Sequence, residues 1–160
     1  MQKGKVIAVD PGYDRVGIAV FDGQVLVHSE CYVPKKGDFA ERLRGVYQRI
    51  TAVIHEYKPA SLAIETLFFT KNQKTAIKVA EARGVIILAA AEADIAVVEY
   101  SPQAVKIAVT GSGNAPKEAV TRMVERLLTL PKKKRLDDEY DAIALGLAHQ
   151  GHATFNMPTR

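Results

Sequence analysis

The chain has 160 residues, of which 48% are hydrophobic and 25% charged, a composition typical of one globular domain and unlike that of a disordered chain. A single cysteine, Cys31, excludes an internal disulfide and a cysteine-rich zinc site; with no membrane-length apolar run and no visible signal peptide, we expect a reduced, cytoplasmic protein. The net charge is +4, and residues 66–135 hold 12 Lys+Arg against 6 Asp+Glu, which indicates a polyanionic partner, although solvated helix faces explain the same charge.

The N-terminal segment predicts a meander of three antiparallel strands. The apolar runs that predict them cover residues 5–10, 16–22 and 24–33. Asp22-Gly23 is a tight hairpin signal between the last two. The first strand ends on Asp10, directly before Pro11-Gly12. An acid in this position is either a turn-former or a side chain that the sheet holds in place for its chemistry.

Helices and strands alternate along the rest of the chain. Apolar residues at helical spacing, with Asp38 as a plausible N-cap, predict the first helix, and Pro59 ends that segment. A short apolar run follows and ends on a second carboxylate, Glu65. The next helix is almost wholly apolar in its C-terminal half, which we expect to be buried. In chain order, the predicted elements are a helix at residues 38–57, a strand at 61–65, a helix at 72–93, a strand at 95–100, and helices at 102–109, 116–130 and 137–150.

These elements predict a single α/β domain over residues 1–151, in which three antiparallel strands continue into strands separated by helices. Residues 152–160 are expected to form a flexible tail. The sequence contains no internal repeat and no stretch that reads as an interdomain linker.

Carboxylates recur at places that a fold can bring together. Asp10 and Glu65 end two strands, and the last helix opens with a cluster of four further acids in the sequence DDEYD. Asp138 and Asp141 lie three apart and Asp137 and Asp141 four apart, so either pair shares one helix face. Four converging carboxylates resist joint ionisation unless cations neutralise them, and oxygen ligands without His or Cys favour Mg²⁺ or Mn²⁺ over zinc. Two such ions can activate a water and stabilise the leaving oxygen of a phosphodiester.

Each of these acids also has a plainer interpretation. Asp10 before Pro-Gly is equally well explained as a turn-former. Asp137 and Asp138 at a helix start are more often caps and partners of the helix dipole than ligands. Glu65 is the least ordinary, because glutamate is depleted in strands and costly to bury unpaired. Together the acids favour a metal site.

Five segments carry a resemblance: VDPG, AIETLFFTKN, KVAEARGVIILAA, SPQAVKIAVTGSGNAPKEAV and DEYDAIALGLAH. Over roughly residues 5–150 the chain resembles the RuvC family of Holliday junction resolvases. The resemblance implies a ribonuclease H-like fold, with a mixed sheet flanked by helices, and a homodimer whose interface includes the helix beginning near Asn72. It also implies Mg²⁺-dependent nicking of two opposed strands of a four-way DNA junction, with a branch-migration complex as a further partner and no membrane.

The resemblance also implies roles for individual residues. The metal-binding tetrad would be Asp10, Glu65, Asp138 and Asp141, because the D-x-x-D-A spacing matches Asp138 and not its neighbour. This tetrad would hold two Mg²⁺ ions, which Mn²⁺ can replace. Further residues match the family's DNA contacts or lie near them: Lys106 and Lys117 beside the scissile phosphate, Phe68 as a platform for an unpaired base, and Lys71, Asn72 and Arg83 near backbone phosphate.

Other interpretations remain open at this point. The opening DPGYDRVGIAVFDG is also similar to YqgF-like proteins, whose nuclease would act on RNA, although those lack the FFTKN loop in this form. An inactive junction-binding protein is argued against by the intact tetrad, and an actin-like ATPase needs two such domains and a longer chain. The basic run at residues 132–135 precedes the last helix and either grips the DNA backbone or solvates a loop.

Overall fold

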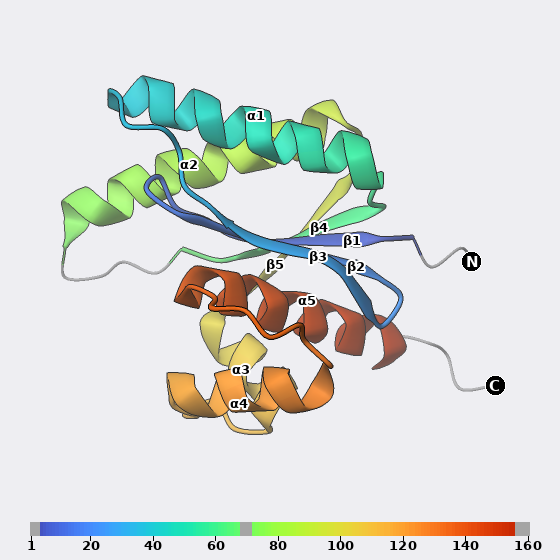
Figure 1. Ribbon diagram of the computed structural model, residues 1–160. Helices are drawn as coiled ribbons and strands as arrows, with labels where there is room; N and C mark the ends of the chain where they lie inside the picture. The colour runs from blue at the N-terminus through green and yellow to red at the C-terminus, as the bar shows by residue number, and fades with distance from the viewer. Residues whose placement is uncertain (1–3, 68–71, 156–160) are drawn as a thin grey trace.

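The computed structural model describes residues 4–67 and 72–155, with the backbone alone for residues 152–155. One mixed sheet lies between two layers of helices, α1 and α2 on one face and α3, α4 and α5 on the other (Figure 1). No helix in these ranges is both long and apolar enough to cross a membrane. The elements are β1 (Val6–Asp10), β2 (Val16–Asp22), β3 (Val25–Tyr32), α1 (Phe39–Tyr57), β4 (Ser61–Glu65), α2 (Gln73–Glu92), β5 (Ala96–Tyr100), α3 (Pro102–Thr110), α4 (Lys117–Leu127) and α5 (Asp137–Phe155).

The sheet has the strand order β3-β2-β1-β4-β5. The pairs β1–β2 and β2–β3 are antiparallel, whereas β1–β4 and β4–β5 are parallel, so the predicted mixed sheet is confirmed. Val9 pairs with Ile64, and the next residue on each strand is Asp10 and Glu65 respectively. Because neighbouring parallel strands run in the same direction, their carboxyl ends lie at the same edge of the sheet, and these two acids lie side by side there.

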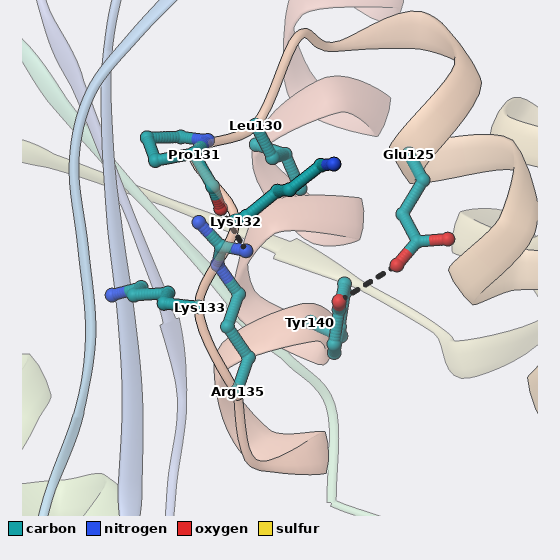
Figure 2. Close-up of a pocket in the computed structure, with 7 residues that line it drawn as sticks. All are labelled: Glu125, Leu130, Pro131, Lys132, Lys133, Arg135 and Tyr140. Carbon is teal, nitrogen blue, oxygen red and sulfur yellow. Dashed lines mark hydrogen bonds between the residues drawn. The ribbon is translucent and has the colours of Figure 1, made fainter.

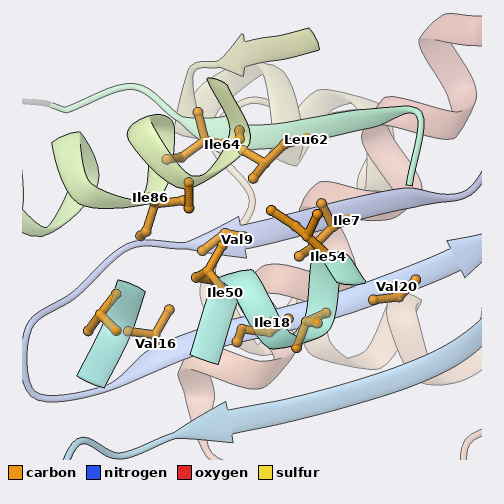
Figure 3. Packing of buried hydrophobic residues seen from close by; sticks show 14 residues of the cluster. Ile7, Val9, Val16, Ile18, Val20, Ile50, Ile54, Leu62, Ile64 and Ile86 are labelled. Carbon is orange, nitrogen blue, oxygen red and sulfur yellow. The ribbon is translucent and has the colours of Figure 1, made fainter. Parts of the chain in front are cut away.

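The two faces of the sheet have different cores. Toward α1 and α2 the strands present large branched side chains, among them Ile7, Val9, Leu62 and Ile64, which pack on Ile50 and other helical residues (Figure 3). Toward α5 the central strands β1 and β4 present alanines, Ala8 and Ala63. Side chains alternate along a strand, so Asp10 continues the face of Ala8 and Glu65 that of Ala63. Both acids therefore point to the side of the sheet that α5 covers.

Glycine lets α5 approach the sheet closely. A Cβ atom on Gly17 of β2 would stand 1.8 Å from the carbonyl oxygen of Asp138, and one on Gly146 of α5 would stand 2.3 Å from the ring of Phe21. Only a residue without a side chain fits at either position. Gly17 is the register partner of Asp10, so this contact brings the first turn of α5 next to the end of β1.

Three predicted boundaries or burial patterns need correction. α4 ends at Leu127 because Leu128 is already extended, and α5 continues to Phe155 instead of ending at Gln150. The C-terminal half of α2 is only partly buried: Ile86 packs into the core, whereas Leu88 is 52% exposed. Its apolar residues thus form two faces, of which one contacts the sheet. The predicted N-cap of α1 is confirmed, since Asp38 forms a capping box with Glu41.

Candidate metal centre

The four acids of the predicted tetrad come to one edge of the sheet. Asp10 and Glu65 lie at the ends of neighbouring strands, and Asp138 and Asp141 lie on the first two turns of α5. The charges of all three partners act on Asp10, so the group is close enough to interact electrostatically. Among the described residues, no three acidic, His or Cys side chains already stand at the distances that hold a metal ion. The structure thus brings the four carboxylates to one place, but their oxygens are not yet at the distances from a common point that a bound metal ion requires.

Burial and mutual repulsion raise the pKa values of three of these carboxyls, those of Asp10, Glu65 and Asp141. Burial, followed by the charges of Asp141, Glu65 and Asp138, raises the pKa of Asp10 to about 8. Burial and then Asp141 raise the pKa of Glu65 to about 7, against the opposing charges of Lys117 and Lys106. Burial also raises the pKa of Asp141. A divalent cation would favour the ionised forms, which is the response expected of a metal site.

Two protein cations contact the helical half of this group. Arg15 Nε lies 3.2 Å from Asp138 Oδ2, and Lys117 Nζ lies 3.3 Å from Asp141 Oδ2 and 3.5 Å from Asp137 Oδ2. Asp138 Oδ2 is buried and accepts no hydrogen bond. A donor set made only of carboxylates, with one buried oxygen short of a hydrogen-bond donor, fits a hard divalent cation. Binding one would require Asp138 and Asp141 to exchange a protein cation for the metal.

The two lysines singled out in the sequence lie beside the acids. A cavity of about 220 Å³ has both lysines and two of the acids in its wall. Its lining residues are Glu65, Pro102, Val105, Lys106, Lys117, Val120, Asp141 and Ala144. Burial lowers the pKa of Lys117, but the carboxylates of Asp141 and Asp137 raise it more, so its pKa is raised and the ammonium group is favoured. The cavity therefore joins negative ligands and positive charge in one space.

The remaining predicted contact residues are placed differently. Asn72 caps α2, and its side-chain oxygen accepts a hydrogen bond from the backbone N–H of Thr75. Arg83 is only 16% exposed; it donates to the backbone carbonyl of Glu65 at 2.9 Å and pairs with Glu99 at 2.8 Å. Arg83 thus supports the strand end that carries Glu65. The positions of Phe68 and Lys71 lie outside the described residues.

Sequence reasoning gave no role to Arg15 or Gly17, although both lie in the first motif. Their importance comes from the antiparallel register, which sets Gly17 opposite Asp10 and places Arg15 in the loop that connects the two strands. A hairpin drawn with this register would have placed both residues near Asp10. It would not have revealed that Gly17 and Arg15 contact Asp138, because those contacts depend on where α5 packs.

Comparison with known proteins agrees with this arrangement. The family model described as crossover junction endodeoxyribonuclease RuvC matches residues 6–149. The chain belongs to the RuvC family. A RuvC from Moorella thermoacetica is 42% identical over 157 residues, covering 95% of this chain and 94% of that protein. One from Thermosipho melanesiensis is 40% identical over 146 residues, covering 88% and 93%. Nucleases of the RuvC family are metal-dependent, which agrees with a set of four carboxylates.

Solved structures agree on the fold. Thermus thermophilus RuvC, in complex with a Holliday junction substrate, superposes with a TM-score of 0.86 and is 32% identical, covering 95% of this chain and 96% of that one. The yeast mitochondrial Holliday junction resolvase Ydc2 has a TM-score of 0.69 at 11% identity and shows the shared fold alone. The ribonuclease H-like fold predicted for the chain is confirmed.

Proposed function

We propose that this chain cuts four-way DNA junctions, intermediates of recombination and repair, by hydrolysing one phosphodiester in each of two opposed strands. The observation that carries the proposal is the meeting of Asp10, Glu65, Asp138 and Asp141 at one sheet edge, beside Lys106 and Lys117, in a chain of the RuvC family. Thermus thermophilus RuvC, whose fold covers 95% of this chain, is in complex with a Holliday junction substrate in its solved structure.

The tetrad would hold two Mg²⁺ ions, with Mn²⁺ as a substitute. When bound, such ions activate a water and stabilise the leaving oxygen, giving a 5′-phosphate and a 3′-hydroxyl. Asp10 and Glu65 supply ligands that move little, because the sheet fixes both strand ends. Their protons must leave as the site fills, so binding is coupled to pH. Asp138 and Asp141 would complete the site, where the metal would compete with Arg15 and Lys117 for their carboxylates.

Lys106 and Lys117 would bind the phosphate that is cut. Lys106 on α3 and Lys117 at the start of α4 line the cavity that Glu65 and Asp141 share, so a phosphate seated there meets two ammonium groups. Such groups stabilise the negative charge that develops on a phosphate oxygen during hydrolysis. Phe68, Lys71, Asn72 and Arg83 remain predicted DNA contacts. Affinity for the junction should rest mostly on phosphates and fall steeply with salt.

A homodimer would give the two cuts a fixed separation. On the face of α2 turned away from the sheet, Ile77 is 57% and Leu88 52% exposed, and Gly84 has open space beside it. An exposed apolar face with small residues suits a two-fold interface, in which each residue meets its counterpart around the axis. A branch-migration complex is proposed as a further partner that moves the crossover.

The proposal is tested by cleavage of a synthetic mobile four-way junction with Mg²⁺, beside a linear duplex and an RNA of matching length. We expect paired, symmetric nicks in the junction and none in the duplex. Cutting of the RNA with the junction left intact would overturn the proposal and favour a YqgF-like ribonuclease. Junction binding without cleavage in Mg²⁺ or Mn²⁺ would indicate an inactive junction-binding protein.

A further inference from the structure

The basic run between α4 and α5 consists of Lys132, Lys133, Lys134 and Arg135, and its members do not behave alike. Lys132, Lys133 and Lys134 are all exposed to solvent, although Lys133 also pairs with Glu139. Arg135, by contrast, has a side chain only 4% exposed. Figure 2 shows it folded back toward the carbonyl oxygen of Pro131, to which its guanidinium donates a hydrogen bond of 3.0 Å. A charge this deeply placed is not available to a DNA backbone.

The partner of the run is Glu139, which, counted as a whole residue, backbone included, is the one charged residue classed as buried in the described parts of the chain, at 4% exposure. Its Oε1 accepts a hydrogen bond of 2.6 Å from Ser29 Oγ on β3. The same oxygen lies 2.9 Å from Lys133 Nζ and 3.3 Å from Arg135 Nε. We call Glu139, Ser29, Lys133 and Arg135 the Glu139 cluster. Burying a carboxylate is tolerated when cations and donors surround it in this way.

The Glu139 cluster lies on the turn of α5 that carries the metal ligands. Glu139 directly follows Asp138 and precedes Asp141 by two residues. Successive helical residues are rotated by about 100°, so Glu139 projects away from the face that Asp138 and Asp141 share. Lys117 contacts that other face, at Asp141 and Asp137. The first turn of α5 is thus held from two sides, by Lys117 on the metal side and by the Glu139 cluster on the side of β3.

We propose that Glu139 is a positioning residue for the metal centre: its cluster fixes the rotation of the first turn of α5 and so the direction in which Asp138 and Asp141 point. Lys133 and Arg135 of the basic run then pair with Glu139, whereas Lys132 and Lys134 are the two members left without a role in the cluster and free to contact DNA. The inference rests on the proposed metal site. Groups that orient metal ligands from behind typically change metal affinity by about 10–100-fold when they are removed.

The test is Mn²⁺ binding to the metal-free protein, measured by calorimetry without DNA, together with junction binding without divalent metal over a range of salt. In Glu139→Gln the side chain keeps its shape and its bond to Ser29 but loses its charge. We expect Mn²⁺ affinity to fall about tenfold, with the salt dependence of junction binding unchanged. The Mg²⁺ concentration for half-maximal cleavage should rise by a similar factor.

Two neighbours in the run provide the matched comparison. Arg135→Met should weaken Mn²⁺ binding about threefold to tenfold and leave the salt slope of junction binding unchanged, whereas Lys134→Met should leave Mn²⁺ affinity unchanged. Ile50→Val, which loosens the core on the opposite face of the sheet, controls for lost stability and should also leave Mn²⁺ affinity unchanged.

Wild-type Mn²⁺ affinity in both Glu139→Gln and Arg135→Met would overturn the inference and leave the metal site standing. A salt slope lowered by about one in Arg135→Met, with Mn²⁺ affinity intact, would likewise overturn it and assign the arginine to a phosphate. Failure of the wild-type protein to bind Mn²⁺ at all would overturn the metal site, and this inference with it.

Discussion

The two halves of the candidate metal centre are built differently. Asp10 and Glu65 sit on strands, where burial is the main cause that raises their pKa values, to about 8 and about 7. Asp138 and Asp141 sit on a helix end, where Arg15 and Lys117 pair with them. The strand half is rigid and resists ionisation, whereas the helical half is ionically paired and depends on how α5 is packed. Substitutions should therefore act on the two halves by different routes.

The largest effect is expected from the strand half. Asp10→Asn removes a ligand that no neighbouring group can replace, so cleavage of a four-way junction should fall by roughly a thousandfold. Junction binding should persist, because it rests on phosphate contacts. Gel-based cleavage and binding assays on the same preparation separate the two. Asp137→Asn is the control: Asp137 is 75% exposed, and cleavage should fall by a few-fold at most. Residual cleavage above a tenth of wild type in Asp10→Asn would remove Asp10 from the metal site.

The strand half should also make the metal-free protein less stable in alkali. A carboxyl whose pKa is higher in the folded than in the unfolded state stabilises the fold fully below its unfolded pKa near 4, and that contribution is lost as pH rises through the folded pKa. For Asp10 and Glu65 the loss falls between about pH 5 and pH 9. We expect the free energy of unfolding to drop by several kcal/mol over this range, because each pH unit through which one of the groups titrates contributes about 1.4 kcal/mol.

Urea unfolding in chelator across that pH range measures this drop. Asp10→Asn should flatten the profile, because one of the two groups no longer titrates. Saturating Mg²⁺ should raise stability most at high pH, where no proton has to be displaced. Stability that increased with pH would mean that the carboxyls are stabilised as anions by their partners, contrary to the burial that dominates here.

Gly17, which pairs with Asp10 in the sheet and touches the backbone of Asp138, is the place to disturb the packing of the helical half on the strand half. A methyl group there would meet the carbonyl of Asp138, so Gly17→Ala must push α5 away from β2. We expect a loss of about 1–3 kcal/mol in the free energy of unfolding, together with weaker metal binding. Denaturant titration and Mn²⁺ calorimetry measure both.

Gly151→Ala on α5, the helix that Gly17 contacts, is the matched control for Gly17→Ala. Nothing lies within 4 Å of the added methyl group, so the helix should gain about 0.5–1 kcal/mol and bind metal normally. Equal effects of the two substitutions would show that α5 tolerates displacement, and would remove the packing argument for the position of Asp138.

The same division explains how much of the protein could be predicted from its sequence. Strand ends are local features, so Asp10 and Glu65 were found from short apolar runs that end on acids, and side-chain alternation gives their common face. The helical half needs tertiary information. Ser29 and Glu139 form their hydrogen bond across 110 positions of sequence, and no periodicity indicates it. Likewise the sequence predicts that α4 reaches residue 130, yet the helix ends at Leu127, and Leu128 and Leu130 pack against the core from beyond its end.

The smallest effect is expected from the ion pair of the helical half. Arg15 is 52% exposed, and a pair so open to solvent contributes about 0–1 kcal/mol, so Arg15→Met should leave the free energy of unfolding nearly unchanged. Its charge nevertheless occupies the carboxylate that a metal would use. Removing it should leave Mn²⁺ affinity equal to that of the wild type or raise it by up to about threefold, because the metal no longer competes with a guanidinium. Calorimetry at constant pH measures the Mn²⁺ affinity. Arg15→Lys, which keeps the positive charge, is the control. Weaker Mn²⁺ binding in Arg15→Met would instead mean that Arg15 holds Asp138 in its binding orientation, and that both halves of the centre are prearranged by the fold.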